Sequence, residues 1–269
     1  MAANLGQIYE TKTHTMLDKL GMVSGGSAGA SHDIPDVTLL KGGKHKSGCE
    51  LKNKPTAAGS LVMQYVNGKW KFGDVTINGV VQEEKLLLKN IGIEYKILDL
   101  MNGKGHPWGK NSPPILQYDS SGGKIVNGVP YKTYSLIQKA KFYKGDRKKF
   151  PGAHEVKQKI NASSICDYYI AKGCSYMNVE SHGFYTLNGQ DDLGLNAFLA
   201  KKGYPLIPDF AASVNAAIRV RMQPKSLSRF EYQFTFTLTF TGPKKSPYNL
   251  SIGGNTAKFI KTHLYEALQ

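Results

Sequence analysis

Apolar side chains recur at helical spacing along the first twenty residues. The apolar positions are Leu5, Ile8, Tyr9, Met16, Leu17 and Leu20. One face of an α-helix collects such a pattern, and Asn4 and Gly21 are suitable residues for its start and its end. A helix is therefore predicted between them. Glu10 lies at the border of its apolar stripe, where it faces either the edge of a sheet or solvent.

The stretch 31–54, SHDIPDVTLLKGGKHKSGCELKNK, has the pattern of two short strands joined by a basic turn. Side chains alternate between the two faces of a strand. Glu50 and Lys52 therefore share one face of the second strand, and Cys49 and Leu51 share the other. If the two strands pair, Asp36 at the start of the first strand lies beside Glu50 and Lys52.

The next segment continues as a hairpin, a helix and a strand. Asn67-Gly68 suits a type I′ turn between alternating residues of 61–72, which predicts the hairpin. The spacing of apolar residues predicts a helix over 80–90 and a strand over 93–98. The order of elements over the first hundred residues is thus helix, strand, strand, hairpin, helix, strand.

The second half has the pattern of an α+β region. Loop-forming residues and a small hairpin at 126–128 come first. Helices are then predicted over 131–143, 153–171 and 256–267, and strands over 175–180, 184–187, 216–222 and 232–240. The segment YQFTFTLTF alternates threonine with apolar residues, which is typical of a long strand. No internal repeat is present.

Charge favours a polyanionic partner. Thirty-five Lys and Arg residues against 20 Asp and Glu give a formal net charge of +15. Such a field attracts phosphates. No apolar run approaches the ~20 residues that span a bilayer, so no membrane association is expected. The N-terminus lacks the pattern of a secretory signal, and three cysteines form no even disulfide set, which favours a cytoplasmic location.

Candidate chemistry is concentrated at the paired strands. Two carboxylates and an ammonium group at one point are costly to assemble unless a divalent cation and an anionic substrate share the space. The cluster of Asp36, Glu50 and Lys52 therefore suggests a metal-dependent phosphodiesterase. The seven histidines show no spacing typical of zinc ligands, and no nucleophile elbow or phosphate-binding loop is present.

Asp36, Glu50 and Lys52 resemble the PD-(D/E)xK signature of restriction-endonuclease-like nucleases. The order of the elements strengthens this resemblance, which covers roughly the first hundred residues. It implies that Asp36 and Glu50 bind Mg²⁺ with the backbone carbonyl of Leu51, with Mn²⁺ as a possible substitute. It also implies that Lys52 orients or activates the attacking water and offsets charge at the phosphate.

The resemblance further implies an acidic residue on the preceding helix. Glu10 is the candidate for this catalytic and metal-binding role, through a second metal or the metal's water shell. Asp18 is an alternative acid on the same helix, and Asp33 is an alternative to Asp36 if the first strand begins earlier.

The fold expected from the resemblance, together with the pattern of the second half, is α/β to α+β. It places a restriction-endonuclease-like core, a mixed central sheet flanked by helices, in 1–125. Residues 126–269 are then an α+β extension with long antiparallel strands, packed on the core and used for DNA contact or dimerisation.

Basic residues near these elements are candidate DNA contacts. They are Lys44, Lys46, Lys54, Arg147, Lys148, Lys149, Arg219 and Arg221. Arg219 and Arg221 share one face of a strand, a spacing suited to phosphates or a groove. The expected function is Mg²⁺-dependent DNA endonuclease, of restriction type and homodimeric. The alternatives are a non-catalytic nucleic-acid-binding protein and a junction-resolving or phage-type nuclease.

Overall fold

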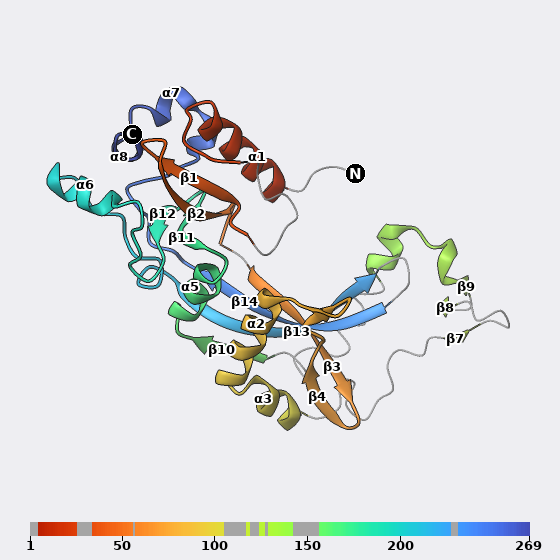
Figure 1. Ribbon diagram of the computed structural model, residues 1–269. Helices are drawn as coiled ribbons and strands as arrows, with labels where there is room; N and C mark the ends of the chain where they lie inside the picture. The colour runs from red at the N-terminus through yellow and green to blue at the C-terminus, as the bar shows by residue number, and fades with distance from the viewer. Residues whose placement is uncertain are drawn as a thin grey trace. The chain divides into compact units, whose positions relative to one another are not determined.

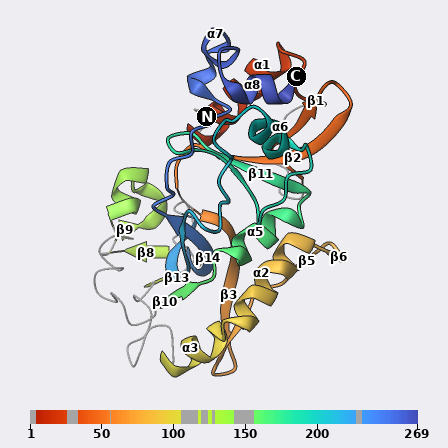
Figure 2. The ribbon, with the colours of Figure 1, turned by 90° about the vertical axis from the view of Figure 1, so that its left-hand side faces the viewer.

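The computed structural model describes residues 5–25, 34–55, 57–104, 117–118, 124–126, 129–141, 156–226 and 231–269 (Figures 1 and 2). The first elements are α1 (Leu5–Asp18), β1 (Val37–Lys41), β2 (His45–Lys52), β3 (Ala57–Val66), β4 (Lys69–Phe72), β5 (Thr76–Ile77), β6 (Val80–Val81), α2 (Glu83–Glu94), α3 (Ile97–Lys104), β7 (Gln117–Tyr118), β8 (Lys124–Val126), β9 (Val129–Pro130) and the 3₁₀ helix η1 (Tyr131–Thr133). The later elements are β10 (Val156–Ile160), α5 (Ser163–Ile170), β11 (Cys174–Val179), β12 (Gly183–Thr186), α6 (Leu195–Lys201), β13 (Asn215–Ser226), β14 (Glu231–Thr241), the 3₁₀ helix η2 (Ile252–Gly254), α7 (Thr256–Phe259) and α8 (His263–Leu268).

The chain has a mixed α/β architecture and divides into two compact units. The first unit combines Met1–Ala58, Lys159–Ala217 and Thr239–Gln269, and the second combines Gly59–Gln158 with Ile218–Leu238. The expected boundary between residues 125 and 126 does not coincide with this division, because it falls inside Gly59–Gln158. Contacts between segments far apart in the chain define the units, and a pattern of local spacing does not report them.

The first unit contains a four-stranded sheet in the order β1-β2-β11-β12. β2 pairs antiparallel with β1 and parallel with β11, so strands more than a hundred residues apart are neighbours. α8 packs near β1, and α1 covers the apolar face of the sheet (Figure 1). Tyr9, Met16 and Leu17 of α1 share one buried cluster with Cys49 and Leu51 of β2.

A second sheet has the order β10-β13-β14-β3-β4. Trp70 on β4 is buried against Phe234 on β14, with ring centroids 4.8 Å apart in an edge-to-face arrangement. The backbone N–H of Trp70 donates a hydrogen bond of 2.7 Å to the side chain of Asn102 on α3. The ring of Trp70 and its backbone N–H thus hold β4 in place at one edge of the sheet. Two small sheets, β5-β6 and β7-β8-β9, complete the strands in the described residues.

Several local predictions are confirmed. α1 ends before Gly21, which has the positive φ of 67° expected of a helix stop. The β3–β4 hairpin turns at Asn67 and Gly68, with φ values of 52° and 77° as a type I′ turn requires. The predicted strands over 175–180, 184–187, 216–222 and 232–240 are present as β11, β12, β13 and β14. The small hairpin is present as β8 and β9, and its turn residues 127–128 lie outside the described residues.

Other local predictions are wrong. The strand expected over 93–98 is the end of α2 and the start of α3, because Lys96 with a φ of 52° separates two helices there. The described part of the helix expected over 153–171 is β10 followed by α5, since buried Val156 and Ile160 alternate with exposed Lys157 and Lys159. Local alternation and helical spacing overlap in such short segments, and tertiary packing decides between them.

Three other predicted helices differ from the structure at their ends. The helix expected over 80–90 begins only at Glu83, after the short strand β6. The helix expected over 131–143 is η1 followed by a helical turn at 136–141, with 142–143 outside the described residues. The C-terminal helix is interrupted between α7 and α8 by Thr262, whose side chain accepts the Tyr265 N–H as an N-cap. No helix in the described residues is long and apolar enough to cross a bilayer.

Candidate active site

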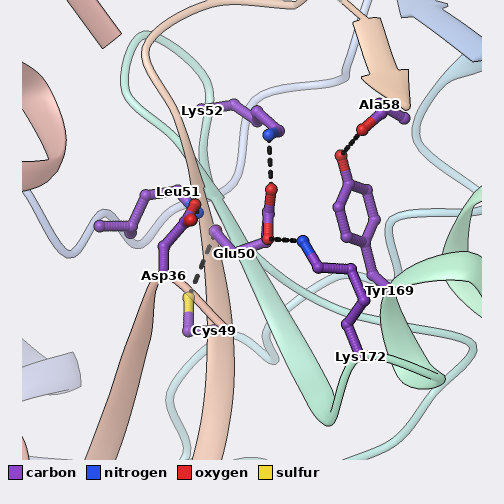
Figure 3. A network of polar contacts seen from close by, with 8 residues as sticks. All are labelled: Asp36, Cys49, Glu50, Leu51, Lys52, Ala58, Tyr169 and Lys172. Carbon is purple, nitrogen blue, oxygen red and sulfur yellow. Dashed lines mark hydrogen bonds and ion pairs between the residues drawn. The ribbon is translucent and has the colours of Figure 1, made fainter. Parts of the chain in front are cut away.

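The pairing of β1 with β2 brings Asp36 to Glu50. Val37 is the register partner of Cys49, so the residue before Val37 faces the residue after Cys49. The Oδ2 atom of Asp36 accepts a hydrogen bond of 2.8 Å from the backbone N–H of Leu51 (Figure 3). One carboxylate is thereby fixed against the strand that carries the other.

Glu50 and Lys52 lie on the same face of β2, as the strand spacing predicts. The Nζ atom of Lys52 lies 2.5 Å from Oε1 of Glu50, and the Glu50 side chain is only 3% exposed. Cys49 and Leu51 point into the apolar cluster beneath α1. The predicted convergence of Asp36, Glu50 and Lys52 is therefore present.

A second lysine, which the sequence pattern does not indicate, completes the cluster. The Nζ atom of Lys172 lies 3.2 Å from Oε2 of Glu50, and its side chain is 8% exposed. Figure 3 shows the two ammonium groups at opposite ends of the Glu50 carboxyl group. Lys172 follows α5, and Gly173 next to it has a φ of 82°, so the local sequence indicates only the end of a helix. The parallel pairing of β11 with β2 places it here.

Tyr169 forms an aromatic wall beside both lysines. Its ring centroid is 5.5 Å from Nζ of Lys52 and 5.3 Å from Nζ of Lys172. Its hydroxyl group donates a hydrogen bond of 2.9 Å to the carbonyl oxygen of Ala58. Lys172 also lies 5.9 Å from the ring of Tyr168. The faces of these rings attract cations and hold the ammonium groups near Glu50.

Burial and mutual repulsion shift the acids toward their neutral forms. Burial, followed by the charge of Glu50, raises the pKa of Asp36 to about 6. Burial, followed by the charge of Asp36, raises the pKa of Glu10 to about 7. Burial alone would lower the pKa of Lys52, but Glu50 and Asp36 raise it above its usual value. A cation bound beside these acids favours their charged forms and offsets the repulsion between them.

Glu10, rather than Asp18, is the acid of α1 that interacts electrostatically with this cluster. Its pKa responds to Asp36, Lys52, Glu50 and Lys172. Asp18 is exposed at the last residue of the helix. The other alternative acid of the sequence, at position 33, lies outside the described residues.

The donor chemistry at Asp36 and Glu50 fits Mg²⁺. This ion prefers hard oxygen ligands and is usually held by one or two carboxylates while it keeps several waters. Both Glu50 oxygens are paired with ammonium groups in the structure. In the part of the chain that the structure describes, no three His, Cys, Asp or Glu side chains converge as a metal-binding group. The metal-binding roles of Asp36, Glu50, Glu10 and the Leu51 carbonyl stay predictions.

The candidate DNA contacts fall into three groups. Lys44, Lys46 and Lys54 are exposed, before, within and after β2. Arg219 and Arg221 are half-buried on β13, and the alternate residues of that strand, at 218 and 220, are fully buried. Arg147, Lys148 and Lys149 lie outside the described residues. The two arginines therefore share a face, as predicted.

Gly48 provides a test of the strand pairing that builds the site. A Cβ atom at this position would lie 2.2 Å from the carbonyl oxygen of Gly173 and 2.4 Å from Cγ of Pro35. We expect Gly48→Ala to lower the free energy of unfolding by about 1–3 kcal/mol, because the backbone beside Lys172 must move. Urea denaturation measures this change.

Gly103→Ala on α3 is the matched control for that substitution. A Cβ atom at Gly103 meets nothing within 4 Å. Alanine in a helix is favoured over glycine by roughly 0.5–1 kcal/mol, so this control is expected to be neutral or stabilising. Equal stability of Gly48→Ala and the wild type would contradict the packing of β2 against Gly173.

No protein-family model matches the sequence. No curated protein matches it either. Among solved structures, HhaI endonuclease in complex with DNA is similar to this chain with a TM-score of 0.39 and 10% sequence identity, over 98% of this chain and 100% of that chain. A similarity this distant carries no argument about activity, so the chemistry is inferred from the site itself.

Proposed function

We propose that this protein is a Mg²⁺-dependent DNA endonuclease that hydrolyses phosphodiester bonds. One observation carries the proposal: half-buried Asp36 is fixed against the strand that carries buried Glu50, with the ammonium group of Lys52 on Glu50. This combination supplies oxygen ligands for a hard cation and a positive charge for a phosphate. A buried arrangement of this kind is costly for a purely structural role, because desolvated carboxylates repel each other.

Each residue has a defined task in the proposed reaction. Asp36 and Glu50 would hold Mg²⁺ with help from the Leu51 carbonyl, and Glu10 would hold the water shell of the ion. The ion would supply charge relief at the phosphate and a more acidic water. Lys52 would orient the attacking water and offset charge at the phosphate. Tyr169 packs beside the ammonium group and fixes its position.

The substrate class follows from charge. The net charge of +15 favours a nucleic acid over a small phosphodiester. Lys44, Lys46 and Lys54 are exposed on the strand or turns next to the proposed catalytic residues, where a phosphate backbone can reach them. The proposed substrate is duplex DNA, and the proposed cleavage is site-specific and of restriction type. The form that cuts both strands is then a homodimer.

Incubation of the purified protein with supercoiled plasmid tests the proposal. We expect cleavage in Mg²⁺ or Mn²⁺ and none in EDTA, because the carboxylates need the cation to bind the phosphate. Asp36→Asn, purified in the same way, controls for contaminating nuclease. Linear product without accumulated nicked circles indicates two sites acting together, as in a homodimer.

A wider set of substrates separates the alternatives. Branched DNA cut in preference to plasmid indicates a junction-resolving enzyme. DNA binding without metal-dependent cleavage of any substrate would refute the nuclease and leave a non-catalytic binding protein.

A further inference from the structure

Lys172 is the member of the cluster that no motif predicts. It reaches Oε2 of Glu50, while Lys52 reaches Oε1, so each carboxylate oxygen has its own ammonium partner. Lys52 is two residues from Glu50 on the same face of one strand, so the backbone keeps the two residues close. Lys172 belongs to a different segment and approaches Glu50 through its long side chain.

The surroundings of Lys172 make its pairing with Glu50 important. Its side chain is 8% exposed, so water cannot fully solvate the ammonium group. A buried charge left without a partner is strongly destabilising. The rings of Tyr168 and Tyr169, at 5.9 and 5.3 Å, offer the ammonium group attraction but no counter-charge. The ion pair between Lys172 and Glu50 therefore breaks at low cost only when another anion replaces Glu50 beside the ammonium group.

Oε2 of Glu50 can bind a metal only after its ion pair with Lys172 is broken. In the absence of DNA, breaking this pair leaves the ammonium group without its ion-pair partner and with only the attraction of Asp36 and Glu10, which opposes cation binding. A DNA phosphate at the site gives Lys172 another counter-ion, so the cation can bind Glu50 without this cost.

We propose that Lys172 is a positioning residue that couples divalent cation binding to DNA binding. It holds Glu50 in the protein without DNA and exchanges this carboxylate for a phosphate when DNA arrives. This inference rests on the proposed nuclease function. Coupling of this kind is reciprocal, so DNA and the cation each tighten the binding of the other.

Mn²⁺ affinity measured by isothermal titration calorimetry tests the inference without a cleavage assay. The titrations use the full chain, alone and with a random-sequence duplex whose linkages are phosphorothioates. In the wild type we expect DNA to tighten Mn²⁺ binding by about tenfold. In Lys172→Met we expect the protein alone to bind Mn²⁺ about tenfold more tightly than the wild type, because a competing positive charge is gone. DNA is then expected to change the Mn²⁺ affinity of this variant little.

Two further variants separate charge from packing. Lys172→Arg keeps the charge and is expected to keep the DNA-dependent tightening. Lys202 is the matched control, because it also pairs with a carboxylate, 3.5 Å from Glu266, and lies 5.7 Å from the ring of Phe198, but is half exposed. Lys202→Met is expected to bind Mn²⁺ like the wild type. Thermal melting followed by circular dichroism establishes that each variant is folded.

The outcomes distinguish the inference from the function beneath it. If the wild type binds Mn²⁺ and cuts DNA, but folded Lys172→Met keeps wild-type affinity and tightening, the coupling role is overturned and the nuclease stands. If Lys172→Met binds Mn²⁺ more weakly, Lys172 supports the metal site instead of competing with the metal. If the wild type neither binds Mn²⁺ nor cuts, both proposals are overturned.

Discussion

Replacement of Lys52 by methionine is expected to lower the rate of Mg²⁺-dependent DNA cleavage by about a thousandfold, in the range typical of a lost proton-transfer or water-positioning group. Lys52 is the ammonium group closest to the paired carboxylates, at 2.5 Å from Glu50. Methionine has a similar length and apolar stem but cannot donate to a water or a phosphate. Single-turnover cleavage of plasmid, with enzyme in excess, measures the chemical step.

Folding and DNA binding are expected to survive this substitution. Glu50 keeps one counter-ion, since Lys172 lies 3.2 Å from its other oxygen. Electrophoretic mobility shift is therefore expected to show DNA affinity within about threefold of wild type, as for the loss of a single phosphate contact. Lys12→Met, an exposed lysine on α1, controls for the loss of one positive charge. Cleavage by Lys52→Met at the wild-type rate would remove Lys52 from the proposed mechanism.

Replacement of Asp36 by asparagine is expected to abolish cleavage and yet stabilise the metal-free protein at pH 8. The pKa of Asp36 is raised to about 6 from its ordinary 3.8, chiefly by burial and then by Glu50. The folded protein thus binds this proton more tightly than the unfolded chain. Stability therefore falls as the pH rises from about 4, and the full penalty, on the order of 3 kcal/mol, is present above the folded pKa.

Asparagine removes most of that penalty. Its side-chain oxygen still accepts the Leu51 N–H, although a neutral acceptor is weaker by about 1 kcal/mol. The net gain at pH 8 is then on the order of 1–2 kcal/mol, and it shrinks toward zero as the pH is lowered to 4. Glu10 contributes a pH dependence of the same sign, because its pKa is raised to about 7.

Urea denaturation in EDTA at pH 4, 6 and 8 measures these differences. Asp18→Asn, an exposed acid at the end of α1, is the matched control and is expected to change stability by less than about 0.5 kcal/mol. A less stable Asp36→Asn protein at pH 8 would show that Asp36 holds the strands together by its charge. That outcome would argue for a structural role.

The sequence alone determined the local geometry of the site. A period of two is a property of any strand, so Glu50 and Lys52 had to share a face and Leu51 had to point the other way. The alternation of polar and apolar residues fixed which face packs on α1. Asn67-Gly68 determined the β3–β4 turn, since these two residue types tolerate the positive φ values that a type I′ turn requires.

Only the tertiary structure decided which distant segments meet. Lys172 reaches Glu50 because β11 pairs parallel with β2, a contact between residues more than a hundred positions apart. Pairing with the distant strand β13 makes 156–160 a strand, and each of the two units combines segments far apart in the sequence. Spacing along a sequence indicates on which face of its own helix or strand a side chain lies. Which other element packs on that face depends on the packing free energy of the whole chain.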